Sequence, residues 1–317
     1  MKSSSDIFPV RLLRADIWDD LAEDIYLIKH NRDKDKTVEI AVSRLSMADQ
    51  TSPPGFPVVL VHGSFTNKGF WLSAKGRGFA RHLVEAGYDV WMLEHRGHGH
   101  SPHNKSYQTN TVEAYAATDL PAVHEFVHEK TGASAIWLGH SIGGTAIATA
   151  LALDSFRRPP RAVALLGTQV LRPLWYLQIP LVPVSLRLFV RVKKGLDGRR
   201  MNIGPEHEPA GVINEYIRRH SLFGRWRAPS AKKDLLIGWR GASVPLLGVS
   251  GSADTQDPDK YCQKFYQLYG GPKQLLTLGR SQGLSRDYGH VDMIVSEPAE
   301  QEVWPVLTQW LKAHVQR

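Results

Sequence analysis

The pentapeptide Gly139-His140-Ser141-Ile142-Gly143 has the pattern G-x-S-x-G, in which one serine lies between two glycines. An apolar run typical of a buried strand, Ser134–Leu138, precedes it, and a helical pattern, Gly143–Asp154, follows it. A sharp turn from strand to helix strains the backbone, and glycines on both sides of the serine remove the steric clash. The stretch therefore predicts Ser141 as a nucleophile, with Gly139 and Gly143 as the elbow glycines.

A serine hydroxyl is a weak nucleophile unless a neighbouring base accepts its proton. His290 is the candidate base, because it lies between the last predicted strand, Gln274–Leu278, and the final predicted helix, Glu300–Val315. His314 is the one later histidine, and it falls inside that helix. We therefore expect the imidazole of His290 to reach the serine over the sheet edge.

An acid is needed to hold the imidazole in the correct tautomer. Asp254 closely follows the predicted strand Val244–Val249 and is the candidate. Its rivals Asp257 and Asp259 lie where a predicted helix, Asp257–Tyr269, begins, so we expect them to cap that helix. The chain order serine, aspartate, histidine agrees with this assignment.

Two backbone N–H groups are expected to bind the oxyanion that forms during acyl transfer. One is the N–H of Ile142, at the start of the helix, where the positive dipole end favours negative charge. The other is the N–H of Ser64, which follows the apolar run Pro57–His62. Because both groups are main-chain donors, the side chains at these positions need not matter.

The remaining pattern alternates strands rich in Val, Ile and Leu with helices, which predicts an α/β fold with a mostly parallel sheet covered on both faces. A β-hairpin comes first and precedes the alternating part. The predicted elements are hairpin strands Asp24–His30 and Thr37–Arg44, strands Tyr88–Leu93 and Arg161–Leu166, and helices Gly76–Ala86 and Thr111–Thr131.

The alternation fails in one segment, which we interpret as a cap inserted between two sheet strands. The predicted domains are a core of residues 1–167 and 241–317, with a lead-in over 1–56, and a cap of residues 168–240. Two apolar clusters, a basic stretch and a predicted helix, Pro209–Leu222, make up the cap. Phe65, Trp175 and Tyr176 are the candidate substrate-pocket residues; equally, the apolar side chains of the cap could serve to hold it on the core.

The formal net charge is +8, and residues 168–240 hold 14 Lys and Arg against 5 Asp and Glu. One segment therefore carries the whole excess. We see no nucleic-acid-binding motif and no aromatic platform among these basic residues, so nucleic acid is not an expected partner. The basic residues are interpreted as solvated charge, with weak contact to an anionic membrane surface as the alternative.

Composition also bears on cellular location and on metal binding. The single cysteine, Cys262, cannot form an internal disulfide, and we find neither a secretory signal nor a transmembrane run, so we expect a cytoplasmic protein. The histidines at 95, 98, 100 and 103 lack an aspartate or cysteine to complete a metal site, so no metal and no cofactor is expected.

With these residues placed, the chain from about residue 57 resembles the α/β-hydrolase superfamily. His62-Gly63 is similar to its oxyanion motif, and Glu94-His95-Arg96-Gly97-His98-Gly99-His100-Ser101 is similar to its D-x-R-G-x-G-x-S loop, with Glu94 replacing the usual Asp. Asp254 and Pro258 are spaced as in the family's acid loop. The resemblance is lipase-like or esterase-like, without an identified subfamily.

The resemblance implies a serine hydrolase that cleaves small-molecule or lipid-like carboxylic esters through an acyl-enzyme on Ser141. The same three side chains also serve thioesterases, acyltransferases and carbon–carbon bond hydrolases. A non-catalytic binding protein on this fold is the third alternative, although such proteins usually lack the serine or the histidine. The natural substrate, the acyl chain length and the oligomeric state do not follow from the sequence.

Overall fold

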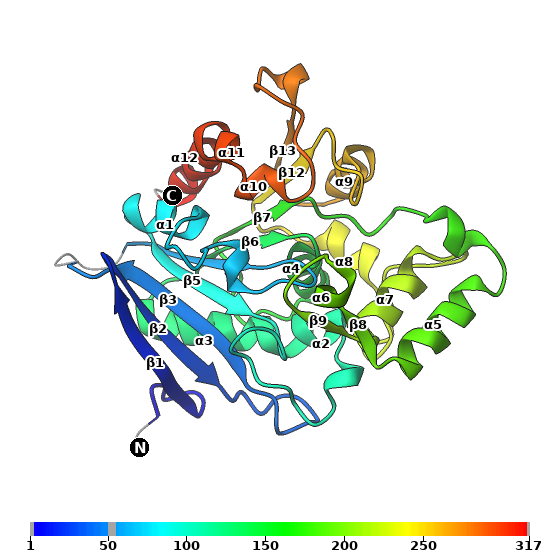
Figure 1. Cartoon of the computed structure of the whole chain (residues 1–317), viewed down its shortest axis with the longest axis horizontal. Coiled ribbons are helices and arrows are strands. Elements are labelled where there is room, and N and C mark those ends of the chain that lie inside the picture. The colour runs from blue at the N-terminus through cyan, green and yellow to red at the C-terminus, as the bar shows by residue number, and fades with distance from the viewer. Residues whose placement is uncertain (1–2, 50–54, 316–317) are drawn as a thin grey trace.

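The computed structural model describes residues 3–49 and 55–315 (Figure 1). Its strands are β1 Val10–Trp18, β2 Leu21–Ile28, β3 Ile40–Met47, β4 Pro57–Val61, β5 Asp89–Glu94, β6 Ile136–His140, β7 Ala162–Leu166, β8 Gly195–Asp197, β9 His207–Pro209, β10 Arg227–Ala228, β11 Lys233–Asp234, β12 Leu246–Gly251 and β13 Lys273–Leu278. Its helices are α1 Phe79–Glu85, α2 Val112–Ala114, α3 Leu120–Thr131, α4 Ile142–Leu153, α5 Val182–Val192, α6 Gly198–Met201, α7 Ala210–His220, α8 Leu235–Gly241, α9 Asp259–Gln267, α10 Asp292–Val295, α11 Glu297–Glu302 and α12 Trp304–Val315.

Nine of the described strands form one sheet, in the order β1-β2-β3-β5-β4-β6-β7-β12-β13. The first three strands are antiparallel, and β3 also pairs with β5 in the antiparallel sense. From β5 to β13 every pairing is parallel. The predicted α/β architecture with a mostly parallel sheet is thus confirmed.

Each face of the sheet is buried under its own set of helices. Along β4, Val59 and Val61 join one core cluster, whereas Val58 and Leu60 join the other, because side chains alternate across a strand. The first cluster is completed by side chains from α3, α4, α8 and α9. The second is completed by side chains from α1 and α12. The carboxyl ends of the parallel strands are left as the edge at which loops meet.

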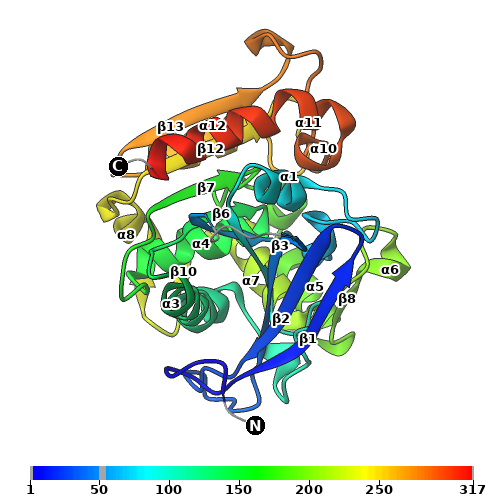
Figure 2. The ribbon, with the colours of Figure 1, turned by 90° about the vertical axis from the view of Figure 1, so that its left-hand side faces the viewer.

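The predicted hairpin is present as β2 and β3, although both strands are shifted by a few residues. The sequence reading missed β1, which pairs with β2 at the sheet edge (Figure 2). Most of its side chains are exposed, so β1 lacks the alternation of apolar and polar residues that marks a half-buried strand. The turn between β1 and β2 places Asp19 at a φ of 52°, a conformation that aspartate tolerates better than most residues.

Three predicted helices differ from the observed ones for local reasons. The helix predicted over 111–131 contains a π-helical turn, Tyr115–Asp119, that ends two residues before Pro121, which has no N–H for the regular ladder. The helix predicted over 76–86 begins only at Phe79, because Gly76 and Gly78 have positive φ. The helix predicted over 300–315 is divided into α11 and α12, next to Pro305.

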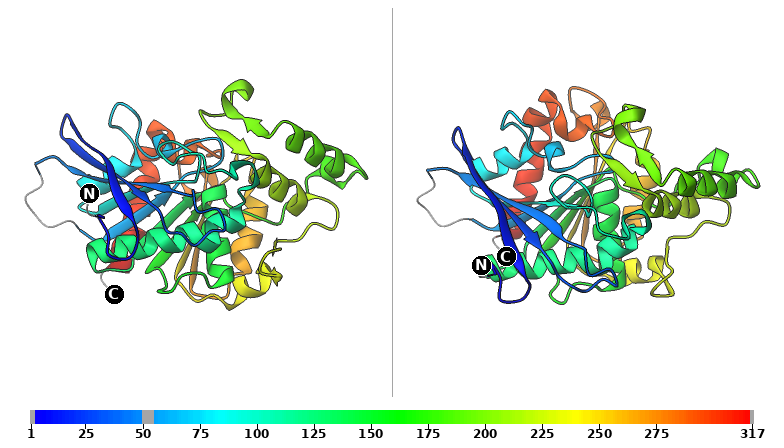
Figure 3. Two further views of the ribbon diagram at one scale, coloured as in Figure 1. Left: turned by 90° about the horizontal axis from the view of Figure 1, so that it is seen from below. Right: turned by 60° about the horizontal axis from the view of Figure 1, so that its bottom comes forward.

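Residues 167–245 connect β7 to β12, which are neighbours in the sheet. Helix α5 of this insertion stands away from the sheet (Figure 3). In contrast, α7 and α8 contact the core, since Val212 of α7 and Leu235 and Trp239 of α8 belong to the larger core cluster. The boundary of the cap at residue 240 stays a prediction, with α8 crossing it. Among the described residues, no helix has the length and apolar composition required to span a bilayer.

Candidate active site

Ser141 lies on the turn between β6, which ends at His140, and α4, which begins at Ile142. Its backbone has φ 53° and ψ −118°, a strained conformation for a residue with a side chain. A Cβ at position 139 would lie 2.6 Å from the Gly144 nitrogen, and one at position 143 would lie 2.5 Å from the carbonyl oxygens of Val61 and His62. These contacts are the physical reason for the two glycines of the motif.

His290 and Asp254 form a buried pair beyond the same edge of the sheet. The Nδ1 atom of His290 lies 2.7 Å from Asp254 Oδ2, and both side chains are at least nine-tenths buried. The other carboxylate oxygen, Oδ1, accepts the N–H groups of Gln256 and Asp257, each at 2.8 Å. Asp254 is therefore held from both sides, in an orientation that fixes the proton on His290 Nδ1 and leaves Nε2 as the basic nitrogen.

Two opposing effects set the pKa of His290. Burial lowers it, because the imidazolium loses solvation. The hydrogen bond to Asp254 and the negative charges of Asp257 and Asp254 raise it, and together they outweigh the burial. The pKa of His290 is consequently raised above its ordinary value of 6.5. The pKa of Asp257 is itself raised to about 6, mainly by burial.

The serine and the pair meet through the end of β7. The N–H of Ser141 donates to the carbonyl of Leu166 at 2.9 Å, and the next residue, Gly167, touches the pair. A Cβ on Gly167 would lie 3.1 Å from His290 Nδ1 and 3.4 Å from Asp254 Oδ2. Among the described residues, no hydrogen bond runs from the hydroxyl of Ser141 to His290 Nε2. Such bonds are often long before substrate binds.

The loop after β4 contacts the elbow directly. A Cβ on Gly63 would lie 3.3 Å from the Cβ of Ser141, so the N–H of Ser64 and the N–H of Ile142 belong to adjoining turns. Ile142 is the first residue of α4, where the N–H has no partner inside the helix. The next N–H along the loop, that of Phe65, is already occupied by the carboxylate of Glu208 at 2.8 Å. The N–H of Ser64 as the loop's oxyanion donor stays a prediction.

Glu208 joins the insertion to this loop. It lies on β9, is buried, and its Oε1 also lies 3.2 Å from His98 Nε2. Burial raises the pKa of Glu208, but the charge of His98 outweighs this effect and lowers the pKa below its usual value. In turn, the negative charge of Glu208 raises the pKa of His98. The N–H of Glu206 donates to the carbonyl of Phe65 at 3.0 Å. The segment 206–208 is thus bonded to both main-chain groups of Phe65, which has a φ of 60°.

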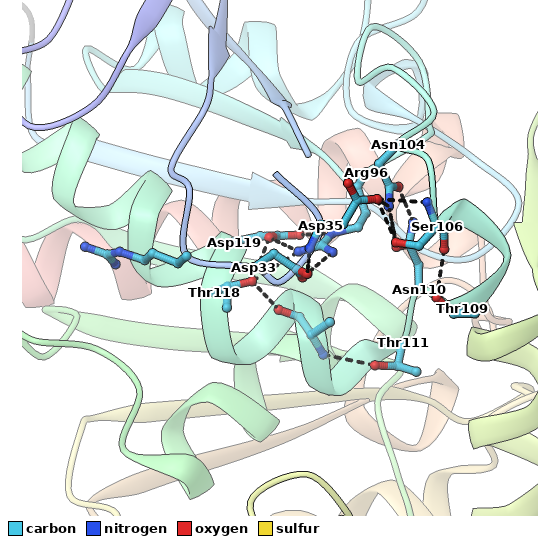
Figure 4. Close-up of polar contacts among 12 residues, drawn as sticks. Asp33, Asp35, Arg96, Asn104, Ser106, Thr109, Asn110, Thr111, Thr118 and Asp119 are labelled. Carbon is cyan, nitrogen blue, oxygen red and sulfur yellow. Dashed lines mark hydrogen bonds and ion pairs between the residues drawn. The ribbon is translucent and has the colours of Figure 1, made fainter. Parts of the chain in front are cut away.

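The loop that follows β5 is held by buried ionic contacts. Arg96 donates to Asp119 at 2.8 Å, to Asp33 at 2.7 Å and to Thr118 at 3.1 Å, and Figure 4 shows these side chains converging from separate parts of the chain. Glu94 accepts from the N–H and the ring of His100, each at 2.9 Å. The substitution of Glu for the usual Asp therefore keeps an acceptor for this loop.

The two rivals of Asp254 do not cap α9 by their side chains, so that expectation was wrong. Asp259 is the first residue of the helix, and its carboxylate accepts from the hydroxyl of Thr277 at 2.9 Å. Asp257 accepts from the amide of Gln169 at 2.6 Å. Both carboxylates meet side-chain donors of neighbouring strands and loops, which compete with the helix N–H groups.

The sequence reading also overlooked His140, the residue before the candidate nucleophile. Its Nε2 donates to the carbonyl of His290 at 2.8 Å, and its ring lies 4.6 Å from the His290 ring. Burial lowers the pKa of His140 well below its usual value, so the ring is neutral. His140 therefore holds the loop of the candidate base. The x positions of G-x-S-x-G carry no signal for such a contact.

Among the described residues, no hydrogen bond or ring contact joins Phe65 to the other two candidate pocket residues, Trp175 and Tyr176. Trp175 is 76% exposed and contacts Tyr176 edge-on at 5.8 Å, whereas Phe65 lies beside Ser64 and meets the insertion through its backbone. A separate cavity of about 580 Å³ is lined by residues that include Lys68, Glu94 and His100, and none of the three candidate pocket residues is among its lining residues.

The histidines near residue 98 have protein partners rather than a shared centre. His98 meets Glu208, and His100 meets Glu94. His103 stacks on Tyr107 at 3.9 Å between ring centroids. Within residues 3–49 and 55–315, no group of three or more His, Cys, Asp or Glu side chains is arranged to hold a metal ion.

The sequence is similar to that of known proteins over part of its length. Residues 57–200 match the family model for the alpha/beta hydrolase fold. Over 122 residues the chain is 34% identical to lipase member N of Mus musculus, a match covering 33% of this chain and 30% of the mouse protein. Over 99 residues it is 37% identical to gastric triacylglycerol lipase of Rattus norvegicus, covering 28% and 25%. The chain thus matches less than a third of the length of these relatives.

A solved structure of a thermophilic esterase from Thermogutta terrifontis resembles the chain over most of its length. The TM-score is 0.61 at 17% identity, and the match covers 89% of this chain and 96% of the esterase. At this identity the likeness establishes the shared arrangement of strands and helices.

Proposed function

We propose that this chain, which matches the family model for the alpha/beta hydrolase fold over residues 57–200, is a serine hydrolase that cleaves carboxylic esters through an acyl-enzyme on Ser141. The observation that carries the proposal is the strained Ser141 beside the buried His290–Asp254 pair, with main-chain donors on adjoining turns. His290 takes the proton of Ser141 as the hydroxyl attacks the ester carbonyl, and later returns it to the leaving alcohol. Water then attacks the acyl-enzyme by the same route.

We propose the remaining roles on the support of the same geometry. Asp254 holds the tautomer of His290 and stabilises the imidazolium that forms in each step. The N–H groups of Ser64 and Ile142 bind the oxyanion of the tetrahedral intermediate. Phe65, Trp175 and Tyr176 are proposed as pocket residues, and residues 168–240 as the cap. The substrates we propose are small-molecule or lipid-like esters, in keeping with the lipases that the chain partly matches.

The proposal extends to location and to a second partner. We place the protein in the cytoplasm, where its one cysteine, the buried Cys262, stays reduced. We also propose a weak contact with an anionic membrane surface, which the basic excess of residues 168–240 supports.

The test is hydrolysis of p-nitrophenyl esters of graded acyl length by the full chain and by Ser141→Ala. We expect activity in the parent and none above the uncatalysed rate in Ser141→Ala, with an unchanged melting temperature. Ser64→Ala is the matched control, because its proposed donor is the backbone and the substitution keeps the N–H. Hydrolysis that persists in Ser141→Ala would remove the proposal. Failure of a fluorophosphonate probe to label Ser141 would favour the non-catalytic alternative.

A panel of thioesters, acyl acceptors and carbon–carbon substrates separates the neighbouring chemistries on the same three side chains. Faster turnover of one of these than of every oxygen ester would replace ester hydrolysis as the assignment, while the roles of Ser141 and His290 would stand.

A further inference from the structure

Helix α5 of the insertion presents an apolar stripe to solvent. Leu181 at its N-cap and Val184, Leu188 and Val192 along it are spaced by three or four residues, so they lie on one face of the helix. Their exposed fractions are 77%, 65%, 61% and 72%. A soluble surface rarely gathers large apolar side chains in this way unless they meet a partner. We call these four residues the α5 stripe.

The stripe is not needed to attach the helix to the protein. The opposite side of α5 supplies Leu186 and the buried Val190 to a small core cluster that also holds Ile217 of α7. The helix is therefore already packed through one face, and the α5 stripe is a second apolar face directed outward. Figure 3 shows α5 at the outer edge of the molecule, away from the sheet.

Basic side chains lie beside the stripe. Arg187 and Arg191 are exposed and occupy the positions three residues after Val184 and Leu188, and the exposed Lys193 and Lys194 follow at the end of the helix. The ion pairs made by residues of the insertion involve Arg200, Arg219 and Glu208 among the described residues, and none involves these four cations. Four uncompensated positive charges thus border an exposed apolar stripe.

We propose that the α5 stripe and its basic border form a docking face for an anionic lipid bilayer. Apolar side chains that enter the acyl boundary, with Lys and Arg at headgroup level, are the chemistry that holds an amphipathic helix in the plane of a membrane. Anionic headgroups would complement the four cations. A second copy on a two-fold axis would instead bring two such basic borders together. A nucleic acid would leave the apolar stripe unsatisfied.

This inference deepens the proposed membrane contact and has a consequence for access to the candidate site. The insertion that carries α5 also supplies β9, whose Glu208 is bonded to the loop holding Ser64. Docking through α5 therefore brings the same structural unit to the bilayer that contacts the candidate oxyanion loop. Esters that partition into the membrane are the substrate class this arrangement serves.

The experiment uses the full chain with Ser141→Ala, so that binding is measured without hydrolysis. Co-sedimentation is measured with extruded vesicles of phosphatidylcholine alone and of phosphatidylcholine with phosphatidylglycerol, at low and high salt. We expect binding to the anionic vesicles at least about tenfold tighter than to the neutral ones, weakened by salt. Adding Leu188→Ser with Val192→Ser, or Arg187→Glu with Arg191→Glu, should weaken binding to anionic vesicles by about tenfold or more.

Ile17→Ser is the matched control, because Ile17 is 72% exposed on β1, far from α5 in the sequence, and should leave binding unchanged. Three outcomes would overturn the proposal: no binding to anionic vesicles at low salt, an equal loss in Ile17→Ser, or sedimentation velocity showing a dimer that Leu188→Ser with Val192→Ser dissociates. Hydrolysis of a soluble ester without vesicles, by the chain with Ser141 intact, tests the proposed function separately. The α5 variants should retain that activity.

Discussion

The N–H of Phe65 donates to Glu208 Oε1 at 2.8 Å, which connects the loop after β4 with a strand 143 positions later in the sequence. Phe65 follows the candidate oxyanion donor Ser64 and is held at a φ of 60°, a region that a phenylalanine seldom adopts. Glu208 is buried and also paired with His98. The insertion therefore supports the shape of a loop that belongs to the core.

Glu208→Ala should lower the turnover number for a soluble ester by up to about 10²-fold, with a smaller change in KM. The reason is that Phe65 loses its acceptor and the N–H of Ser64 is no longer held in place. Steady-state kinetics separates the two constants. Glu208→Gln, which keeps an acceptor oxygen, should recover part of the loss.

The control for that variant is Glu215→Ala, which removes another buried carboxylate of the insertion. Glu215 accepts the N–H of Val112 at 2.8 Å, and among the described residues it makes no hydrogen bond to the loop of Ser64. Both variants should lower the melting temperature, but only Glu208→Ala should lower the turnover number. Equal losses of turnover in the two variants would reduce Glu208 to a purely structural residue.

The rate should depend on pH through His290. The base acts only when it is neutral, and its pKa is raised above 6.5 in the folded protein. Activity should therefore be low in acid and rise with pH, with the midpoint of kcat/KM above 6.5. A pH–rate profile on a soluble ester measures this midpoint, and a value clearly below 6.5 would contradict the predicted pairing.

Asp254→Asn should lower kcat by about 10⁴-fold, because asparagine no longer fixes the imidazole tautomer or stabilises the imidazolium. The residual activity should also show its acidic midpoint at lower pH, since the hydrogen bond and charge that raise the pKa of His290 are lost. Asp259→Asn is the comparison, as that carboxylate lies on α9 and meets the hydroxyls of Ser250 and Thr277. It should retain most of the activity.

Gly143→Ala should reduce both activity and stability, because the new Cβ would lie 2.5 Å from two carbonyl oxygens at the end of β4. The backbone has to shift to relieve this clash, and we expect the resulting strain to lower the free energy of unfolding by about 1–3 kcal/mol. Gly241→Ala provides the reference, since no atom lies within 4 Å of its added Cβ. Chemical denaturation of both variants should show a lower free energy of unfolding only for Gly143→Ala.

Arg96→Leu should destabilise the fold by about 3–5 kcal/mol, because it leaves the buried carboxylate of Asp119 without its guanidinium partner. Arg11→Leu breaks an exposed pair with Glu39 and should cost at most about 1 kcal/mol. Urea denaturation of the two variants gives the comparison. Similar small losses in both would show that Asp119 finds another partner.

Much of the fold can be predicted from local sequence features alone. The elbow around Ser141 was predictable because a side chain at either glycine of the motif would clash with neighbouring backbone. The parallel sheet followed from apolar runs alternating with helical patterns. The edge strand β1 and the π-helical turn before Pro121 were missed, because an exposed strand has no apolar alternation and a π turn keeps the helical pattern.

The sequence by itself determined the order of the three candidate catalytic residues along the chain: a serine, an aspartate and a histidine, each placed after a predicted strand. Only the tertiary structure decided which side chains meet. Glu208 contacts Phe65, and His140 contacts His290, across 143 and 150 positions of sequence. No local pattern encodes such pairs, because their contact depends on how the insertion and the loops fold over the sheet edge.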